Sequence, residues 1–249
     1  GPMAIARAEG ALDRFQELEH DLGEAATLSV LAQVKMAKDC EAALMAAKNA
    51  QALFQSLGDW RREAAVNRLL VGAHLANGSV SEALQTALQL LESFREKGDR
   101  RNEAATMVLL AEVHSSRENS QDALQWSKQA AQVFRDIEDV RNEAASWYAI
   151  AKGHIERNEP DDAEQGLGAA QEGRRLFQEL GDGQKEMMLA ALEHSALFLQ
   201  GEAAEALRVA KDDLSAMQAK PGQRAAVAGA LHELVNVHMT RQEPQEARR

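Results

Sequence analysis

The sequence predicts an all-α fold, an α-solenoid of stacked antiparallel helix pairs. Two observations support this prediction: a unit of about 40 residues recurs along the chain, and the composition favours helices. Ala, Leu, Glu, Gln and Arg dominate the 249 residues, whereas aromatic residues make up 4% and there are 4 prolines. Straight side chains keep most of their rotamer freedom in a helix, and the residue types that favour strands are scarce here.

The repeat is most visible in phenylalanines that close one helix of each unit. Successive members are separated by 39, 40, 40 and 43 residues: Phe15, Phe54, Phe94, Phe134 and Phe177. Similar segments follow three of them, LGDWRREAA at 57–65, KGDRRNEAA at 97–105 and IEDVRNEAA at 137–145. A helix pair of this length cannot bury its apolar face alone, so we expect the pairs to stack and to share a continuous core.

Each period divides into two amphipathic helices. In 64–77, Leu70 and His74 fall on one face, and in 81–96 Leu90 and Phe94 do the same. An Asp precedes the first helix of each pair, where negative charge meets the positive end of the helix dipole. The predicted helices cover 4–18, 24–38, 40–57, 61–77, 80–97, 101–117, 120–137, 141–157, 160–180, 184–200, 202–218, 223–241 and 244 onward.

No linker interrupts this pattern. We therefore expect one domain over 4–249, with about six helix-pair units and half-units at both ends. Residues 1–3 contain Gly1-Pro2 ahead of Met3, which resembles a protease-cleavage scar and is excluded from the array. An insertion of three residues near 164–176 precedes the fifth unit. Because Glu193 and His194 then fall where core residues belong, a shifted helix register is expected there.

Within this frame the residues resemble the tetratricopeptide repeat (TPR) family over 4–249. The family places an apolar or aromatic residue early in the first helix, Leu and a small residue in the middle of that helix, an aromatic residue one turn on, and Ala at the start of the second helix. This order is kept by Trp147, Ile150, Ala151, His154 and Ala163. The long unit with its Gly-Asp-x-x-x-Glu-Ala joint is similar to that of G-protein-signalling and cell-polarity adaptors. The resemblance implies a right-handed superhelix.

Charge and cysteine content exclude several classes of protein. A formal net charge of −11 argues against a general nucleic-acid or anionic-membrane surface. No apolar run approaches the roughly 18 residues of a membrane helix, so no membrane insertion is expected. Cys40, the only cysteine, cannot form an intrachain disulfide or a zinc cluster. We expect a cytoplasmic protein without cofactors.

Repeated polar residues allow catalytic or metal chemistry to be considered. Histidines recur one per unit, but metal ligands must converge within about 2 Å of one ion, whereas packed helices lie about 8–10 Å apart. Packing therefore explains them better: His74, His114 and His154. Arginines recur at the joints, where exposed ion pairs explain them better than a phosphate ladder: Arg61, Arg101 and Arg141. Without a nucleophile–base pair, a metal set or a phosphate loop, no enzyme is expected.

The remaining candidate for a functional site is a surface that binds another protein. The resemblance implies that the first helices of successive units line a concave groove that receives a peptide or a partner helix. Residues one position from the core face would then line it in two rows. Tyr148 is the best aromatic anchor of these rows, and Arg68 and Lys152 are the best partners for carboxylates or carbonyls. The predicted binding residues are Leu28, Arg68, Gly72, Val108, Glu112, Tyr148, Lys152, His232 and Asn236.

The predicted function is a non-enzymatic scaffold that binds a peptide or helical segment of another protein. The acidic bulk of the chain favours a basic segment, because opposite charge speeds encounter. A structural alternative is self-association, in which the end helices or the insertion at 164–176 pair between copies of the chain.

Overall fold

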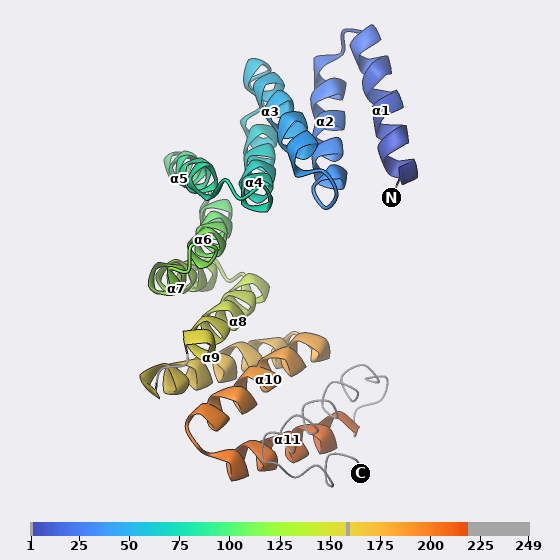
Figure 1. Ribbon diagram of the computed structural model, residues 1–249. Helices are drawn as coiled ribbons and strands as arrows, with labels where there is room; N and C mark the ends of the chain where they lie inside the picture. The colour runs from blue at the N-terminus through green and yellow to red at the C-terminus, as the bar shows by residue number, and fades with distance from the viewer. Residues whose placement is uncertain (1, 158–159, 219–249) are drawn as a thin grey trace. The chain divides into compact units, whose positions relative to one another are not determined.

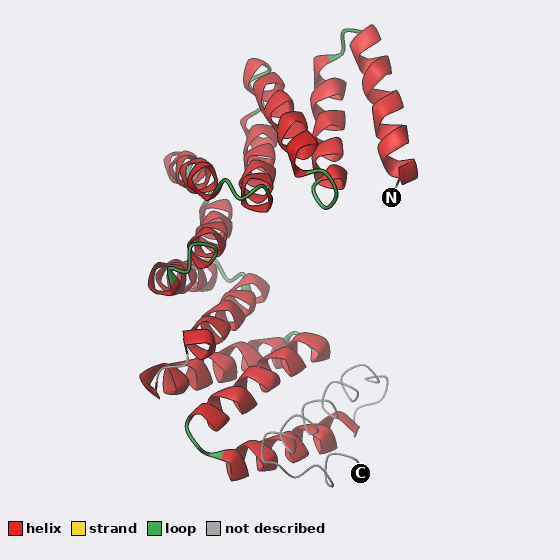
Figure 2. Cartoon of the chain, in the orientation of Figure 1, coloured by secondary structure: helices red, strands yellow, loops and turns green. Residues whose placement is uncertain are grey.

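A computed structural model describes residues 2–157 and 160–218, and this part of the chain contains eleven α-helices and no strand (Figures 1 and 2). The predicted helices of this region are confirmed, with ends that agree within three residues. The predicted helices at 223–241 and from 244 onward lie outside the described residues. The helices are α1 (Pro2–Glu17), α2 (Asp21–Lys35), α3 (Cys40–Ser56), α4 (Trp60–Ala76), α5 (Val80–Glu96), α6 (Arg100–Ser115), α7 (Ser120–Asp136), α8 (Val140–Arg157), α9 (Pro160–Glu179), α10 (Gly183–Leu199) and α11 (Ala203–Gln218).

The chain divides into two compact units, Gly1–Asn119 and Ser120–Arg249. Within the first unit, consecutive helices from α1 through to α6 pack on one another, and within the second unit consecutive helices from α7 through to α11 do the same. First helices of successive pairs also meet, α2 with α4 and α4 with α6 in one unit, and α8 with α10 in the other. We call the side that these helices present the first-helix face of each unit. The all-α fold of stacked helix pairs is confirmed, and one continuous array over 4–249 stays a prediction.

The core is built from small residues and one large ring per joint. Alanines such as Ala47, Ala87 and Ala170 are completely buried, so the backbones of neighbouring helices approach closely. The joint phenylalanines are each 2% exposed: Phe54, Phe94, Phe134 and Phe177. Burying a Phe side chain contributes about 2–3 kcal/mol by apolar transfer, so the periodic Phe holds each joint together.

Joints between consecutive helix pairs share one capping geometry. Asp59 and Asp99 precede α4 and α6, and each accepts a hydrogen bond from the backbone N–H three residues on. The residue before each Asp, Gly58 and Gly98, has a φ of 66° and 65°, a left-handed conformation that glycine adopts without strain. The Gly-Asp pair therefore ends one helix and begins the next.

The prediction of a shifted helix register in the fifth helix pair, α10 and α11, is wrong. Glu193 and His194 are buried in α10 because neighbouring helices compensate their polarity. The Arg174 guanidinium of α9 lies 2.8 Å from a Glu193 carboxylate oxygen and also pairs with Asp213 of α11. His194 Nε2 lies 3.4 Å from the same Asp213. We call these four residues the buried ionic cluster.

The insertion is absorbed by α9, which is 20 residues long and continuous. Gly166 and Gly173 permit this helix to lie close to its neighbours. A Cβ at Gly166 would meet Ile155 Cγ1 at 3.2 Å, and a Cβ at Gly173 would meet Trp147 Cβ at 2.9 Å. These glycines are therefore packing residues at the contacts of α9 with α8.

Candidate functional site

The first-helix face of the first unit holds a cationic pocket. Arg68 is exposed on α4 and lines a cavity of about 260 Å³ between α4, α5 and α6. We call it the Arg68 pocket, and its lining residues are Trp60, Arg61, Ala64, Ala65, Arg68, Phe94, Asp99 and Asn102.

Both arginines that line the Arg68 pocket, Arg61 and Arg68, are exposed. The Arg61 guanidinium carbon and the Lys97 ammonium each lie 5.3 Å from the centroid of the Trp60 ring. Within the described residues, neither Arg61 nor Arg68 forms an ion pair. Asp99, the carboxylate of this pocket, caps α6 and accepts a 2.9 Å hydrogen bond from Asn102 Nδ2. Two guanidinium groups beside an aromatic ring can bind a carboxylate or another oxyanion.

A smaller apolar notch lies on the first-helix face of the second unit. Tyr148 is half-buried on α8 and lines a cavity of about 100 Å³. We call it the Tyr148 notch, lined by Ala145, Tyr148, Phe177, Lys185 and Met188. The Lys185 ammonium lies 5.2 Å from the Phe177 ring, a cation–π contact at the rim. The notch has room for one small apolar side chain, and Lys185 and Tyr148 are the lining residues that carry polar groups.

Other predicted residues on this face are less distinctive. Gly72 is half-buried, and a Cβ there would meet Met36 Sδ at 3.5 Å, an ordinary contact. Val108 is half-buried, and Glu112 is exposed although desolvation raises the pKa of its carboxyl. Lys152 is exposed and lies 3.5 Å from Glu156 on its own helix. Their roles in binding stay predictions.

One predicted site residue is wrong in its placement. Leu28 is 6% exposed and belongs to the core cluster that α2 shares with α3 and α4, together with Phe54 and Leu70. The face of α2 that the repeat pattern assigns to the groove is thus turned into the core, where Ala32 is also completely buried. His232 and Asn236 lie outside the described residues.

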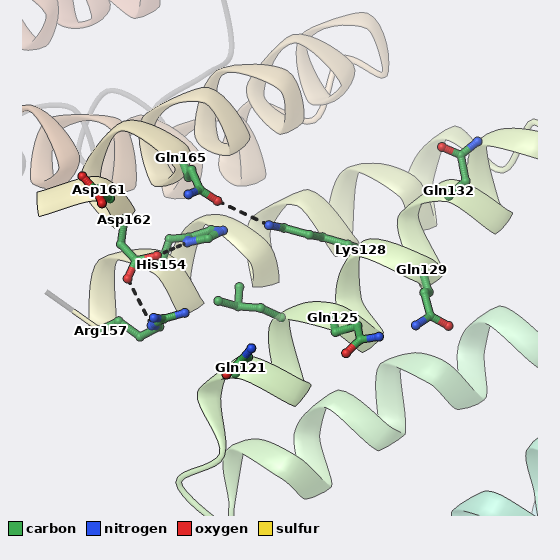
Figure 3. A pocket seen from close by; sticks show the side chains of 11 residues that line it. Gln121, Gln125, Lys128, Gln129, Gln132, His154, Arg157, Asp161, Asp162 and Gln165 are labelled. Atoms are coloured by element: carbon green, nitrogen blue, oxygen red, sulfur yellow. Dashed lines mark hydrogen bonds and ion pairs between the residues drawn. The ribbon is translucent and has the colours of Figure 1, made fainter. Parts of the chain in front are cut away.

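A third cavity is lined mainly by second helices of the helix pairs, α7 and α9, where the sequence predicts no site. It has a volume of about 700 Å³ and lies between α7, the end of α8 and the start of α9 (Figure 3). We call it the glutamine groove, lined by Gln121, Leu124, Gln125, Lys128, Gln129, Gln132, His154, Arg157, Asp161, Asp162 and Gln165. The signal that could have found it is the series of glutamines on α7, which reads like an ordinary solvated helix face.

A polar trio, of which His154 and Asp162 are buried and Arg157 is half-buried, lines one end of the glutamine groove. His154 is 3% exposed, and its Nδ1 lies 2.6 Å from Asp162 Oδ1, while Arg157 Nε lies 3.1 Å from Asp162 Oδ2 (Figure 3). Burial lowers the pKa of His154, and the hydrogen bond to Asp162 opposes this shift only in part. The ring is therefore neutral at pH 7, with Nδ1–H donating to Asp162. The trio ties the end of α8 to the start of α9.

Within the described residues, no group of three or more His, Cys, Asp or Glu side chains is placed to hold a metal ion. The same part of the chain has no helix with the length and hydropathy needed to cross a membrane.

No family model and no curated protein sequence matches the chain. Solved structures do match. A signal transduction ATPase with a tetratricopeptide repeat sensor from Pyrococcus horikoshii has a TM-score of 0.75 and 16% identity, over 96% of this chain and 38% of that one. The present chain therefore spans less than half of that protein.

Two Rap proteins are similar as well. The apo form of RapI has a TM-score of 0.69 and 14% identity, over 98% of this chain and 86% of that one. A Rap protein complexed with Competence and Sporulation Factor has a TM-score of 0.64 and 15% identity, over 96% and 71%. At these identities the likeness concerns the fold, which is a TPR-like helical repeat.

Proposed function

We propose that the chain is a non-enzymatic scaffold whose first-helix face binds a segment of another protein. The Arg68 pocket receives an acidic group of that segment, and the Tyr148 notch receives an apolar side chain. The observation that carries the proposal is the pair Arg61 and Arg68, which line one cavity together with Asp99 and form no ion pair within the described residues.

The chemistry of the pocket defines the anchor of the partner. A guanidinium presents parallel N–H donors that match the two oxygens of a carboxylate, and Trp60 offers an apolar wall beside them. The chain as a whole carries a net charge of −11, so basic residues flanking the acidic anchor would be attracted to the rest of the surface. We therefore propose a partner segment with one acidic anchor and basic flanks.

The similar folds support a binding role by analogy. One Rap structure is a complex with Competence and Sporulation Factor, and the repeats of the Pyrococcus horikoshii protein are described as a sensor. Likeness of fold alone does not transfer function, so the proposed binding role depends on the Arg68 pocket. The predicted similarity to G-protein-signalling adaptors and the cytoplasmic location stay predictions.

Peptide selection on the purified chain tests the proposal. A phage-displayed library of random dodecapeptides is selected on the wild type, and the enriched peptides are synthesised with a fluorescein label. We expect acidic peptides that bind the Arg61→Ala/Arg68→Ala variant at least tenfold more weakly, about 1.4 kcal/mol. Arg62→Ala is the matched control, because Arg62 lies on the same helix but pairs with Asp59 and does not line the pocket. Equal affinity for wild type and double variant would contradict the proposal.

Self-association is a second candidate, favoured by exposed apolar side chains at one end of the first unit. Met3 of α1, Val30 of α2 and Met45 of α3 are 75%, 51% and 64% exposed, and Leu18 just after α1 is 73% exposed. Exposed apolar side chains indicate an interface where they form one contiguous patch. Light scattering from 1 to about 100 µM should show a dimer that Met45→Lys and Leu18→Lys disrupt, whereas a monomer throughout that range excludes it.

A further inference from the structure

The glutamine groove is lined mainly by second helices of the helix pairs, α7 and α9, whereas the Arg68 pocket is lined mainly by a first helix, α4. We propose that it is a second docking site, which holds an extended, mostly uncharged polypeptide segment of a partner through the segment's own backbone. The site lies wholly within the second unit, and it is independent of the function proposed above.

Long polar side chains recur at regular spacing along one face of α7. Three glutamines and a lysine occupy positions i, i+4, i+7 and i+11 of one face: Gln121, Gln125, Lys128 and Gln132. Neighbouring members are about 4.5–6 Å apart along the helix axis, and an extended chain advances about 6.6 Å per two residues. A segment parallel to α7 would therefore meet about one long polar side chain for every two residues over a length of five or six residues.

The chemistry of the row suits a peptide backbone. Each glutamine amide carries two N–H donors and one carbonyl acceptor, so it can pair with both the C=O and the N–H of an extended segment. Within the described residues, the side chains of Gln121, Gln125 and Gln129 make no hydrogen bond. Across the groove, Lys128 Nζ lies 3.5 Å from Gln165 Oε1, a long contact that a bound backbone could replace (Figure 3).

Comparison between repeats shows that this row is particular to α7. At the equivalent positions α5 has one glutamine, with Ser81, Gln85, Leu88 and Glu92, and α3 has none, with Glu41, Met45, Lys48 and Ala52. On α9 the equivalent residues are Asp161, Gln165, Gly168 and Glu172. The repeat scaffold itself therefore does not require glutamines here.

The face of α9 that lines the groove continues into a glycine without a side chain. Gly168 follows Asp161 and Gln165 on the same helix face, is exposed, and has open space around the position of a Cβ. A glycine inside a helix lowers stability relative to alanine, and packing does not require one at this position. Gly168 lies just beyond the residues that line the groove, between Gln165, which contacts Lys128, and Glu172, which pairs with Arg135.

Charge and an unsatisfied atom define the rest of the occupant. Asp161 is exposed and has no ion pair among the described residues, so a basic side chain of the segment fits that end, while the amide row fits uncharged residues. His154 Nε2 is buried at the wall and finds no hydrogen-bond partner among the described residues. As the acceptor nitrogen of the neutral ring, it would be satisfied by a donor brought with the segment, directly or through water.

The experiment uses random octapeptides displayed on phage, selected on the wild-type chain and then synthesised with fluorescein. Among the peptides that bind, we expect a class whose affinity falls at least tenfold in Gln121→Ala/Gln125→Ala/Gln132→Ala. The same class should lose at least tenfold in Gly168→Leu, which places a bulky side chain beside the groove, while the melting temperature of that variant does not fall. Alternate N-methylation of the peptide backbone should also weaken binding at least tenfold.

Two controls separate this site from others. Gln85→Ala/Gln89→Ala removes two exposed glutamines of α5 and should leave affinity unchanged, as should Arg61→Ala/Arg68→Ala in the first unit. The proposal is overturned if every selected octapeptide keeps its affinity in the triple glutamine variant and in Gly168→Leu, or if no octapeptide binds the wild type. Full binding by the N-methylated peptide would overturn the backbone contact.

Discussion

The joint arginines of the two units occupy the same repeat position and have different surroundings. Arg61 in the first unit lies over the Trp60 ring, and the described residues offer it no ion pair. Arg141 in the second unit lies 3.6 Å from Asp182. The repeat therefore fixes where a side chain stands, whereas its neighbours decide whether the charge is available to a ligand.

Other cations are paired in both units, since Arg95 pairs with Glu103 in the first unit as its repeat equivalent Arg135 pairs with Glu143 in the second. Arg135 pairs with Glu143 at 2.7 Å and with Glu172 at 3.2 Å, and Arg174 is held in the buried ionic cluster. These charges contribute to the packing of helices. In the first unit, Arg68 and Arg61 are left to the solvent of a pocket, which suits them to recognition. Substitutions can break this contrast, and the following are ordered from the largest expected effect to the smallest.

The largest effect is expected in the buried ionic cluster. Arg174→Met removes the cation between Glu193 and Asp213 and leaves two buried carboxylates uncompensated, at a cost of about 3–5 kcal/mol. Arg68→Met in the first unit should change stability by less than about 0.5 kcal/mol. Urea denaturation followed by circular dichroism measures both, and equal effects would contradict the contrast between buried and available arginines.

Two glycines of α9 should respond in opposite directions. In Gly173→Ala the new Cβ would lie 2.9 Å from Trp147 Cβ and 3.1 Å from Leu189 Cδ1, so overpacking should cost about 1–3 kcal/mol. Gly168→Ala meets open space and should stabilise the helix by up to about 1 kcal/mol. Thermal unfolding of both variants checks the pair, and a stabilised Gly173→Ala protein would show that α8 and α9 are not in close contact there.

Buried histidines in both units predict a loss of stability in mild acid. Burial lowers the pKa of His74, with a further lowering from Lys48, and burial likewise lowers that of His154. The unfolded chain therefore takes up these protons near pH 6.5 and the folded chain only at lower pH. Their contribution to stability is complete above about pH 6.5 and is lost as the pH falls toward the folded-state values.

Urea midpoints at pH 7.5 and 5.5 measure this dependence. His74→Phe keeps a ring in the buried position and should reduce the difference between the two pH values. A difference that is as large in the variant as in the wild type would assign the acid sensitivity to other groups.

The smallest effect is expected for an exposed pair of the second unit. Lys152 and Glu156 lie one turn apart on α8 with their ions 3.5 Å apart, and both are more than half exposed. Lys152→Ala should cost less than about 0.5 kcal/mol. A larger loss in thermal unfolding would mean that Lys152 makes contacts beyond this pair.

The sequence was sufficient for the fold because its strongest signals are periodic. Phe54, Phe94 and Phe134 recur at 40 residues, and each is buried at a joint, so one pattern predicts many contacts. The prediction that Leu28 lines the groove is wrong because a rotation of α2 about its own axis by one residue position exchanges core and surface. The repeat period does not define this rotation that finely. The register shift predicted from Glu193 and His194 is wrong because their partners, Arg174 and Asp213, come from other helices.

The site was only partly predictable for a related reason. Arg68 and Tyr148 were named from their row, and each lines a cavity in the structure. The cavity also depends on Trp60, Phe94 and Asn102, which belong to three helices and have no common spacing in the sequence. The glutamine groove was missed because polar residues on one face of a helix usually only contact solvent, and the facing wall of α9 is what makes them a groove.

Photo-crosslinking at the Arg68 pocket tests the central claim most directly. Ala65 is exposed and lines the pocket, so benzoylphenylalanine can replace it, and replacement of exposed Leu88 on α5 serves as the control. Each protein is irradiated with an acidic fluorescein-labelled peptide selected on the wild type. We predict a covalent adduct at position 65, lost in the presence of excess unlabelled peptide, and none at position 88. An adduct at position 88 with none at position 65 would contradict the assignment of the Arg68 pocket as the binding site.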